Sequence, residues 1–526
     1  MIKSKNPYLF WSLAFILSGI AVRLIHIDLP ILEGAITRQI QTATITRNLL
    51  ANGFDVLHPQ IDQLPEPRFY AIEPPVYNSI VALLYLIFGV HESLGRLVSI
   101  LFFAGTAGFI FRIASRHVNE SVARAAVFVF CFSPLSIIFT RGFQPDSTAL
   151  FFSTACLFYS IEWIRGNTKA YTPALVFALV AFLTKQTLMF VLLPIGLYAL
   201  RQQGSSVFKN LKLYLLFGLA ILPGVLWSWH AKHLVKLYPS PSVEDIFAWS
   251  NWFDLSVFFH YYFYKTLFQW FSGLILTPIG FSLFLAGLFI KSNKDGDFIL
   301  NTWLAAVVIF DLVLHKHTFT HEYYHLPLLP VASIMIGKTW GVFFENPDYT
   351  GNDVLFSKPF RIVGLLLVGV MVYGYSNSGF KLPASVSPFY EEVETLNANA
   401  KDNERVIVTQ IHPLYYGNNK GWGLAYNPVH YKKLEKYLPA KHHHLPPYIN
   451  LIEAWREEGA AVFFETRPSR FYQHKEFVDY MLTHYPVTQQ KKDAYILFNL
   501  REKIKPMNPL THSSRGSSTH ESGNLS

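Results

Sequence analysis

Residues 28–77 read DLPILEGAITRQIQTATITRNLLANGFDVLHPQIDQLPEPRFYAIEPPVY, and they follow directly on an apolar segment, residues 8–27. That segment is long enough to cross the ~30 Å hydrocarbon core of a bilayer. A chain that only spans a membrane does not need a polar stretch of this size beside it. We therefore predict that residues 28–93 form an outer loop with juxtamembrane helices, and that functional residues lie in this loop.

The composition predicts an integral membrane protein. The 526 residues are 51% hydrophobic and 15% charged, with 46 Phe, 28 Tyr and 11 Trp, which lies outside the usual soluble range. The formal net charge of +9 comes largely from basic residues in short loops between apolar runs, and this pattern reports membrane orientation and does not predict nucleic-acid binding. Cys131 and Cys156 lie in apolar runs, so we expect no disulfide framework and no cysteine metal site.

Apolar runs predict about eleven membrane spans. Their ranges are 8–27, 94–112, 122–139, 147–164, 170–184, 187–200, 212–229, 268–290, 298–314, 323–340 and 361–378. The apolar run 76–90 is short for a span, and we expect it to lie along the outer face of the membrane. This choice keeps the basic loops inside. It also places the unusual polar residues together outside, namely Glu33, Glu73, Asp146, Lys185 and His321.

The predicted fold class is mostly α, a polytopic membrane helix bundle over residues 1–379 with a small extracytoplasmic α/β domain over residues 380–503. The pattern of the second part indicates strands at 405–410, 460–465 and 494–500, and amphipathic helices near 388–400, 449–458 and 474–484. Residues 504–526 are rich in Ser, His and Gly, and we expect a disordered tail. No internal repeat is visible.

Three acidic residues of the predicted outer face are candidates for chemistry. Glu33 lies close to the membrane interface, where a carboxylate can face a reaction site or can simply be solvated. Glu73 precedes Pro74-Pro75, which restrict the backbone and favour a fixed position for the acid. Asp146 either caps the following helix or joins the site.

Basic residues in the same loops could bind a phosphate. Arg141 offers paired donors to phosphoryl oxygens. Lys185 lies between two apolar runs, where a charge needs a partner, water, or an extended path to the surface. The segment HKHTFTHEYYH, residues 315–325, holds four histidines that could bind a metal, contact a phosphate or sugar, or anchor the chain at the interface. Its pattern does not match a zinc-protease helix, so we predict no metal site and no certain cofactor, and a divalent metal stays open.

Several short motifs together resemble one family, the membrane glycosyltransferases of the GT-C class, particularly bacterial relatives of protein mannosyltransferases and of the lipid A aminoarabinose transferase. The resemblance covers residues 8–340. It is carried by RQIQTA at 38–43, TRNLL at 46–50, EPPVY at 73–77, QPD at 144–146, LTK at 183–185 and HEYYHLPLLP at 321–330. Lys420-Gly421-Trp422 also resembles a recurring feature of the soluble part in some relatives.

The resemblance implies transfer of a sugar from a polyprenyl-phosphate donor to an envelope glycan, lipid or protein, on the outer face of the cytoplasmic membrane. Many members carry an acidic pair shortly before the arginine corresponding to Arg47, whereas Arg38-Gln39 holds that place here. The catalytic candidates are therefore Glu33, as the nearest acid, and Asp146. The substrate-binding candidates are Arg38, Gln39, Gln41, Glu73, Tyr77, Arg141, Lys185, His321 and Tyr324.

The expected reaction is a single inverting displacement in which a carboxylate accepts the proton of the acceptor hydroxyl and a lipid phosphate leaves. The alternative is a transporter or flippase of lipid-linked sugars, with the same polar residues along a path; the missing inverted repeat and the large outer parts speak against it. A third hypothesis is a non-catalytic scaffold that binds envelope glycan. The expected partners are the lipid-linked donor, the acceptor and the bilayer, without nucleic acid.

Overall fold

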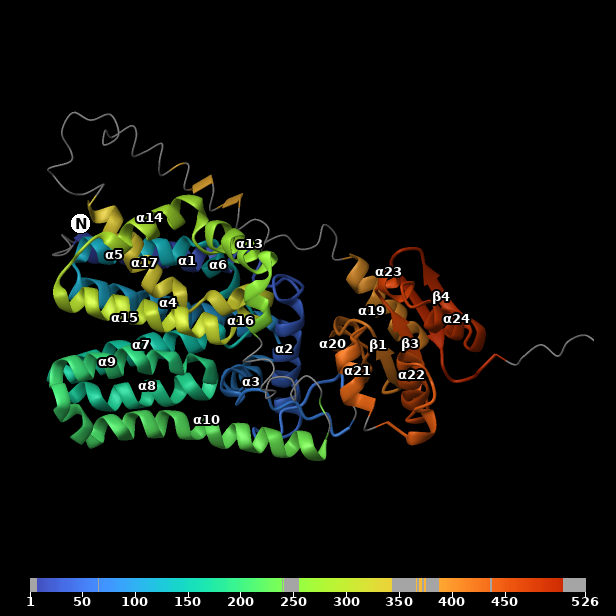
Figure 1. Ribbon diagram of the computed structural model, residues 1–526. Coiled ribbons are helices and arrows are strands. Elements are labelled where there is room, and N and C mark those ends of the chain that lie inside the picture. Colours follow the sequence, from blue (N-terminus) through green and yellow to red (C-terminus); the bar gives the residue numbers. More distant parts are fainter. Residues whose placement is uncertain are drawn as a thin grey trace, which may run out of the picture.

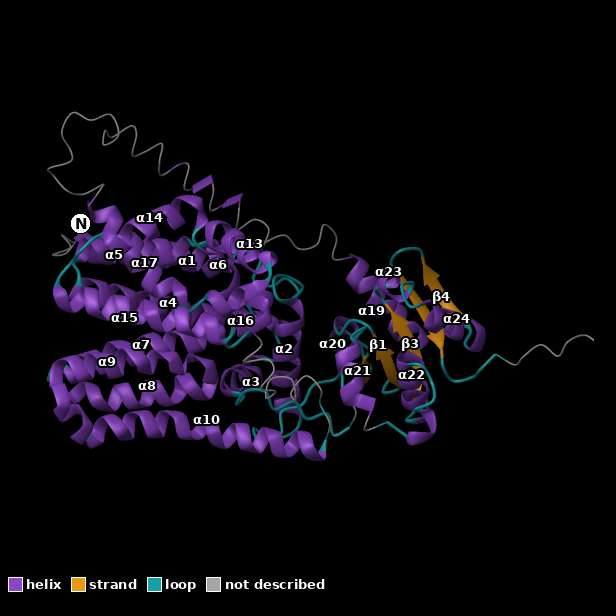
Figure 2. Cartoon of the chain, viewed as in Figure 1, coloured by secondary structure: helices purple, strands orange, loops and turns teal. Residues whose placement is uncertain are grey.

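A bundle of helices with roughly aligned axes forms one end of the molecule, and a small sheet with its own helices forms the other (Figures 1 and 2). The computed structural model describes residues 7–64, 66–238, 240, 255–342, 387–435 and 438–504, with single positions between 366 and 374. The predicted span 361–378 lies largely outside these residues. The predicted tail lies outside them except for its first residue.

The bundle is built from apolar helices. They are α1 (Pro7–Leu24), α4 (Glu92–His117), α5 (Glu120–Phe132), α7 (Asp146–Ile164), α8 (Tyr171–Thr184), α9 (Leu192–Gln203), α10 (Leu211–Leu237), α14 (Thr277–Phe289), α15 (Lys294–Val313) and α17 (Leu328–Trp340). Within the described residues, α1, α4, α7, α10 and α15 are long and apolar enough to cross a membrane, and a bent helix pair raises the number from five to six. The number of eleven spans stays a prediction.

Two predicted spans are broken helices. Residues 122–139 divide into α5 and α6 (Pro134–Phe139), because Pro134 has no N–H to continue the first helix. Residues 268–290 form the end of α13 (Tyr261–Gln269), a π-helical segment (Trp270–Ile275) and α14, with a bend of 101° between the two halves. Thr277, with φ of 64°, and Pro278 lie at this bend.

Two helices of the outer loop lie at one end of the bundle. Figure 1 shows α2 (Ile36–Ala51) running across the direction of the bundle helices. The neighbouring α3 (Val76–Phe88) has 13 residues, which span only about 20 Å at 1.5 Å per residue and do not reach across a hydrocarbon core. Length thus agrees with the expected juxtamembrane position of the run 76–90.

The C-terminal part is a five-stranded sheet in the order β2-β1-β3-β5-β4. Its strands are β1 (Arg405–Val408), β2 (Lys420–Gly423), β3 (Ala460–Glu465), β4 (Val487–Lys491) and β5 (Tyr495–Asn499). β2, β1 and β3 are parallel, whereas β5 is antiparallel to β3 and β4. The three predicted strands are present, as are helices α19 (Ser387–Asn399), α22 (Pro447–Glu457) and α24 (Lys475–His484).

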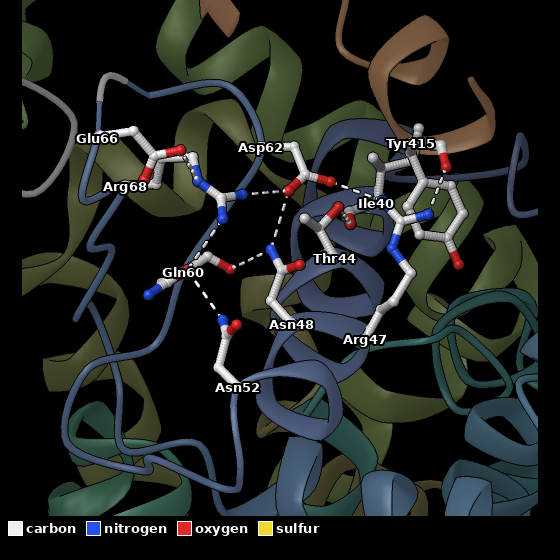
Figure 3. A network of polar contacts seen from close by, with 10 residues as sticks. All are labelled: Ile40, Thr44, Arg47, Asn48, Asn52, Gln60, Asp62, Glu66, Arg68 and Tyr415. Carbon is white, nitrogen blue, oxygen red and sulfur yellow. Dashed lines mark hydrogen bonds and ion pairs between the residues drawn. The ribbon is translucent and has the colours of Figure 1, made fainter. Parts of the chain in front are cut away.

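A network around Asp62 joins the outer loop to the C-terminal part (Figure 3). The Asp62 carboxylate accepts hydrogen bonds from Arg47 at 2.6 Å, Asn48 at 3.0 Å and Arg68 at 2.7 Å. Arg47 also donates to the Tyr415 carbonyl at 2.8 Å and lies over the Tyr415 ring. Because Asp62 is 3% exposed, these bonds are shielded from water and are stronger than surface pairs.

The same loop covers the edge of the sheet at β2. The Gly421 N–H donates to the Asp62 carbonyl at 3.0 Å, and the Gly423 N–H donates to the Gln63 carbonyl at 3.3 Å. A β-carbon on Gly421 would lie 1.8 Å from the Val406 carbonyl oxygen, so this strand requires glycine at that position. The outer loop and the sheet therefore hold one another in place.

Candidate active site

A cavity of about 610 Å³ lies between the outer loop, the bundle and the C-terminal sheet. Its wall includes six of the residues predicted for the site, namely Arg38, Gln41, Glu73, Lys185, His321 and Tyr324. The other lining residues are Gly34, Ala35, Ile36, Thr37, Tyr70, Ile72, His317, Tyr323, Gln410 and Arg467. Segments far apart in the sequence thus meet at one polar hollow.

The N-terminus of α2 lies in the cavity wall. Residues 34–37 line the cavity, α2 begins at Ile36, and no side chain caps it within the described part of the chain. The first N–H groups of a helix lack intrahelical acceptors and carry partial positive charge. A phosphate or carboxylate is the natural partner for such an end.

Arg38 and Glu73 form an ion pair at the cavity, with 17% and 20% of their side chains exposed. Burial lowers the pKa of Arg38, but Glu73, followed by Tyr323 and Asp146, more than offsets this, so the pKa lies above its usual value. The arginine therefore stays charged. Glu73 is the carboxylate that lines this cavity among the residues that the structure describes.

Lys185 and Asp146 form a second pair, in which Lys185 Nζ donates to Asp146 Oδ1 at 2.5 Å. Both are buried, and Lys185 Nζ lies 4.4 Å from the centre of the Tyr324 ring. Lys185 is positioned by the end of α8, where its backbone becomes extended. Asp146 lies in the first turn of α7, but its carboxylate contacts a small neighbouring cavity that Lys185 and Tyr324 also line.

The histidine segment contributes two rings to the cavity. His317 stacks on Tyr324 with ring centres 5.4 Å apart, and His321 stacks on Tyr323 at the same distance. Burial, followed by His321 and Lys185, lowers the pKa of His317 to about 4, and burial followed by Lys185 and Arg38 lowers that of His321. Both are therefore neutral at pH 7. Within the described residues, no group of three His, Cys, Asp or Glu could hold a metal ion.

Neutral burial of His317 predicts an acid-sensitive fold. Because the folded pKa is about 4 and the unfolded pKa about 6.5, the stabilisation is complete above pH 6.5 and is lost as the pH falls towards 4. The variant His317→Gln is expected to lose less thermal stability than the parent between pH 7 and pH 4.5, as measured by unfolding in detergent. Parallel stability curves would contradict this assignment.

Glu33 and Arg141 lie outside the cavity lining. Glu33 Oε1 is 3.2 Å from a guanidinium nitrogen of Arg96 and 3.6 Å from one of Arg141. All three side chains are at most 7% exposed. The structure therefore places our first catalytic candidate in a buried charge cluster, with its carboxylate directed at two arginines.

Gln39 and Tyr77 also support the scaffold. Gln39 donates to the Glu33 carbonyl and accepts a hydrogen bond from the Phe143 N–H at 2.8 Å. The Tyr77 hydroxyl donates to the Gly95 carbonyl at 2.8 Å. Both side chains are buried, so they fix the base of the outer loop behind the cavity.

Ten of the lining residues were not among the site residues predicted from the sequence, and five of these carry a ring, an amide or a guanidinium: Tyr70, His317, Tyr323, Gln410 and Arg467. His317 and Tyr323 belong to the histidine segment, whose density was a signal for them. Tyr70 lies in the outer loop. Gln410 and Arg467 follow strands of the C-terminal sheet, and no local pattern connects them to a membrane site.

Comparison with known proteins agrees with this architecture. Residues 72–229 match the family described as dolichyl-phosphate-mannose-protein mannosyltransferase. The structure superimposes on ArnT from Cupriavidus metallidurans, solved with undecaprenyl phosphate, with a TM-score of 0.62 at 14% identity, covering 93% of this chain and 98% of ArnT. This chain has the GT-C glycosyltransferase fold. It is accordingly a multi-pass membrane protein, and the GT-C resemblance seen in the sequence is confirmed.

Two further proteins are similar to this chain over different lengths. The Archaeoglobus fulgidus oligosaccharyltransferase gives a TM-score of 0.57 at 10% identity, covering 92% of this chain and 73% of that protein. A protein of Aquifex aeolicus (strain VF5) described as uncharacterized is 29% identical over 312 residues, or 57% of this chain. The match spans 65% of the length of that relative.

Proposed function

We propose that this protein transfers a sugar from a polyprenyl-phosphate donor to an acceptor on the outer face of the cytoplasmic membrane, with the chemistry in the cavity. One observation carries the proposal: two cations, Arg38 and Lys185, an uncapped helix N-terminus and the carboxylate of Glu73 all line the same hollow. Cations and backbone amides suit a lipid phosphate. A carboxylate at the same place suits activation of a hydroxyl.

The phosphate of the donor would bind on the bundle side of the cavity. Lys185 already donates to Asp146 at 2.5 Å, and Arg38 already contacts Glu73. Each pair holds its cation in position before the donor arrives. As the glycosidic bond breaks, negative charge on the leaving phosphate increases, and these cations with the α2 N-terminus stabilise it.

The acceptor hydroxyl would lose its proton to Glu73. Glu73 lines the cavity and is held by Arg38, whereas Glu33 faces Arg96 and Arg141 outside it. Asp146 contacts Lys185 and serves to hold that cation in position. The acceptor oxygen bonds to the anomeric carbon, the bond from that carbon to the phosphate oxygen breaks, and Glu73 takes the proton. A phosphate leaves without a strong acid, so one carboxylate is sufficient.

The proposed acceptor is an envelope glycan, a lipid or a protein. The C-terminal part would lie outside the cytoplasm. We likewise propose that the chain divides into a membrane bundle (residues 1–379), a soluble α/β domain (380–503) and a tail (504–526). A lipid-linked sugar transporter explains the cations but gives Glu73 no reaction, and the GT-C likeness does not favour it.

Binding of undecaprenyl phosphate to the full chain in nanodiscs tests the donor site. Removing one charge-assisted contact costs about 1.5–3 kcal/mol, so affinity is expected to fall about tenfold or more when Lys185 is lost. Because Lys185→Met would leave Asp146 buried without a partner, the informative variant is the double exchange Asp146→Asn with Lys185→Met. Exposed Lys169→Met is the matched control.

Two outcomes decide this experiment. Saturable binding by the parent and the Lys169 variant, weakened in the double variant, supports the donor site. No binding by the parent, or equal binding by the double variant, would contradict it. Mass spectrometry of envelope glycans and glycoproteins with and without the gene then identifies the missing sugar and its acceptor.

A further inference from the structure

The C-terminal sheet has a topological switch point at the cavity. From β1 the chain passes to β2 on one side, and from β2 it crosses to β3 on the other side of β1. In open sheets with parallel strands, ligands bind at the carboxyl ends where the connections diverge in this way. The residues directly after β1 and β3 include Gln410 and Arg467, and both line the cavity.

The side chain of Arg467 lines this space. The side chain is half-buried and, among the residues that the structure describes, its guanidinium makes no hydrogen bond or close ion pair. Burial, followed by the neighbouring Arg470, lowers the pKa of Arg467, and the Glu465 carboxylate only partly offsets this destabilisation of its positive charge. An anion in the cavity would compensate it. In this respect Arg467 differs from Arg38 and Lys185, which already contact carboxylates.

The turn that carries Arg467 is held rigidly. The buried Glu465 carboxylate accepts hydrogen bonds from the Arg467 N–H, from Tyr426 and, at 3.0 Å, from Thr409. Thr409 in turn accepts from the Thr466 N–H at 2.9 Å. These contacts tie the residues after β1 to those after β3. A positioned arginine loses less conformational entropy on binding a ligand than a free surface arginine does.

The two walls of the cavity differ in what they can reach. On the proposed function, the wall made by the bundle and α2 binds the lipid-borne phosphate of the donor. The C-terminal part supplies the other wall through Gln410 and Arg467. A second ligand in the same cavity would therefore contact Arg467 through a charged group and Gln410 through a hydroxyl or amide.

We infer that the β1–β3 edge is an acceptor subsite, in which Arg467 binds a phosphate or carboxylate group of the acceptor sugar and Gln410 a neighbouring hydroxyl. The inference rests on the proposed function and adds the charge class of the acceptor. It gives the C-terminal part a role in substrate selection. Neutral glycans lack the group that Arg467 binds, so they would be poor acceptors.

Binding probes on the full chain in nanodiscs test the subsite. The probes are a hexose 1-phosphate, a hexuronate, the neutral hexose and inorganic phosphate, with undecaprenyl phosphate as the donor-side probe. The parent is expected to bind the two anionic sugars more tightly than the other two small probes. Arg467→Gln should weaken both anionic sugars about tenfold, the equivalent of one charge-assisted contact, and leave undecaprenyl phosphate unchanged.

Two further variants sharpen the result. Exposed Arg470→Gln, three residues along the same segment, is the matched control and should change the affinities far less than Arg467→Gln does. Arg467→Lys keeps the charge but loses the paired donors, so it should restore phosphate binding in part. Unfolding temperatures of all variants confirm that they fold.

Each remaining outcome decides against the inference. If Arg467→Gln weakened undecaprenyl phosphate binding as much as anionic sugar binding, Arg467 would belong to the donor site. If anionic sugar binding were unchanged, Arg467 would bind neither donor nor acceptor. Inorganic phosphate binding as tightly as the hexose phosphate would indicate a simple anion site. If the parent binds undecaprenyl phosphate but Arg467→Gln does not weaken anionic sugar binding, this inference alone is contradicted. If the parent does not bind undecaprenyl phosphate, the proposed function is contradicted.

Discussion

Exchange of Glu73 for Gln is expected to lower kcat by about 10²–10⁴, the range that a positioned general base contributes. The amide keeps the size of the side chain but cannot accept the hydroxyl proton. Glu73 pairs with Arg38, one of the two cations proposed for the lipid phosphate, and the neutral amide leaves that guanidinium available to the phosphate. Affinity for undecaprenyl phosphate should therefore not fall. Single-turnover sugar transfer in proteoliposomes measures the chemical step directly.

The matched control for this variant is Glu66→Gln. Glu66 lies in the same outer loop and also pairs with an arginine, Arg68, but its side chain is 52% exposed and lies outside the cavity lining. It should transfer sugar at the parental rate. A rate loss in Glu73→Gln that is fully restored by a second exchange, Arg38→Gln, would show that pairing and not proton transfer was disturbed. Such a result would reject Glu73 as the base.

Exchange of Glu33 for Gln is expected to destabilise the protein by about 3–5 kcal/mol, the usual cost of leaving buried charge without its counter-ion. Two fully buried guanidinium groups, those of Arg96 and Arg141, share this carboxylate. Arg96 keeps its bonds to the carbonyls of Ile27 and Pro30, but backbone dipoles do not replace a full negative charge. Unfolding in detergent should therefore occur at a lower temperature.

This second variant separates two roles for Glu33. As a scaffold residue, its loss should leave the rate per folded molecule unchanged, whereas as the base its loss would slow transfer without unfolding the chain. Exposed Glu476→Gln, in α24, is the control for stability. A Glu33→Gln variant as stable as the parent but slow in single turnover would return the catalytic assignment to Glu33.

The bundle and the sheet could be predicted from the sequence because each depends on a local pattern. Long apolar runs exclude water over a whole segment, and alternation marks the strands of the C-terminal part. The breaks were harder. Pro134 and Pro278 lie in runs that are apolar on both sides, so hydropathy continues where the helix does not. Two strands were missed for a related reason: β2, KGWG, is rich in glycine, and β4, VTQQK, is exposed.

The cavity residues could be predicted in part. Charged side chains beside apolar segments are energetically costly, and the sequence shows three of them: Arg38, Glu73 and Lys185. What the sequence does not show is which buried charges compensate one another. Glu33 and Arg141 looked like site residues for the same reason, and they contact each other instead. Arg467 is placed by a sheet that forms about four hundred residues after α2, beyond any local pattern.

The hydrogen bonds between β2 and the outer loop affect the order in which the site can form. The carbonyls of Asp62 and Gln63 accept hydrogen bonds from the N–H groups of Gly421 and Gly423. The outer loop is synthesised early, but these bonds form only after strand β2 has been synthesised. Until then the cavity lacks the wall that carries Arg467. A nascent chain already inserted in the membrane therefore holds its cations without an enclosed space, and the proposed site is complete only when the outer loop and the sheet have met.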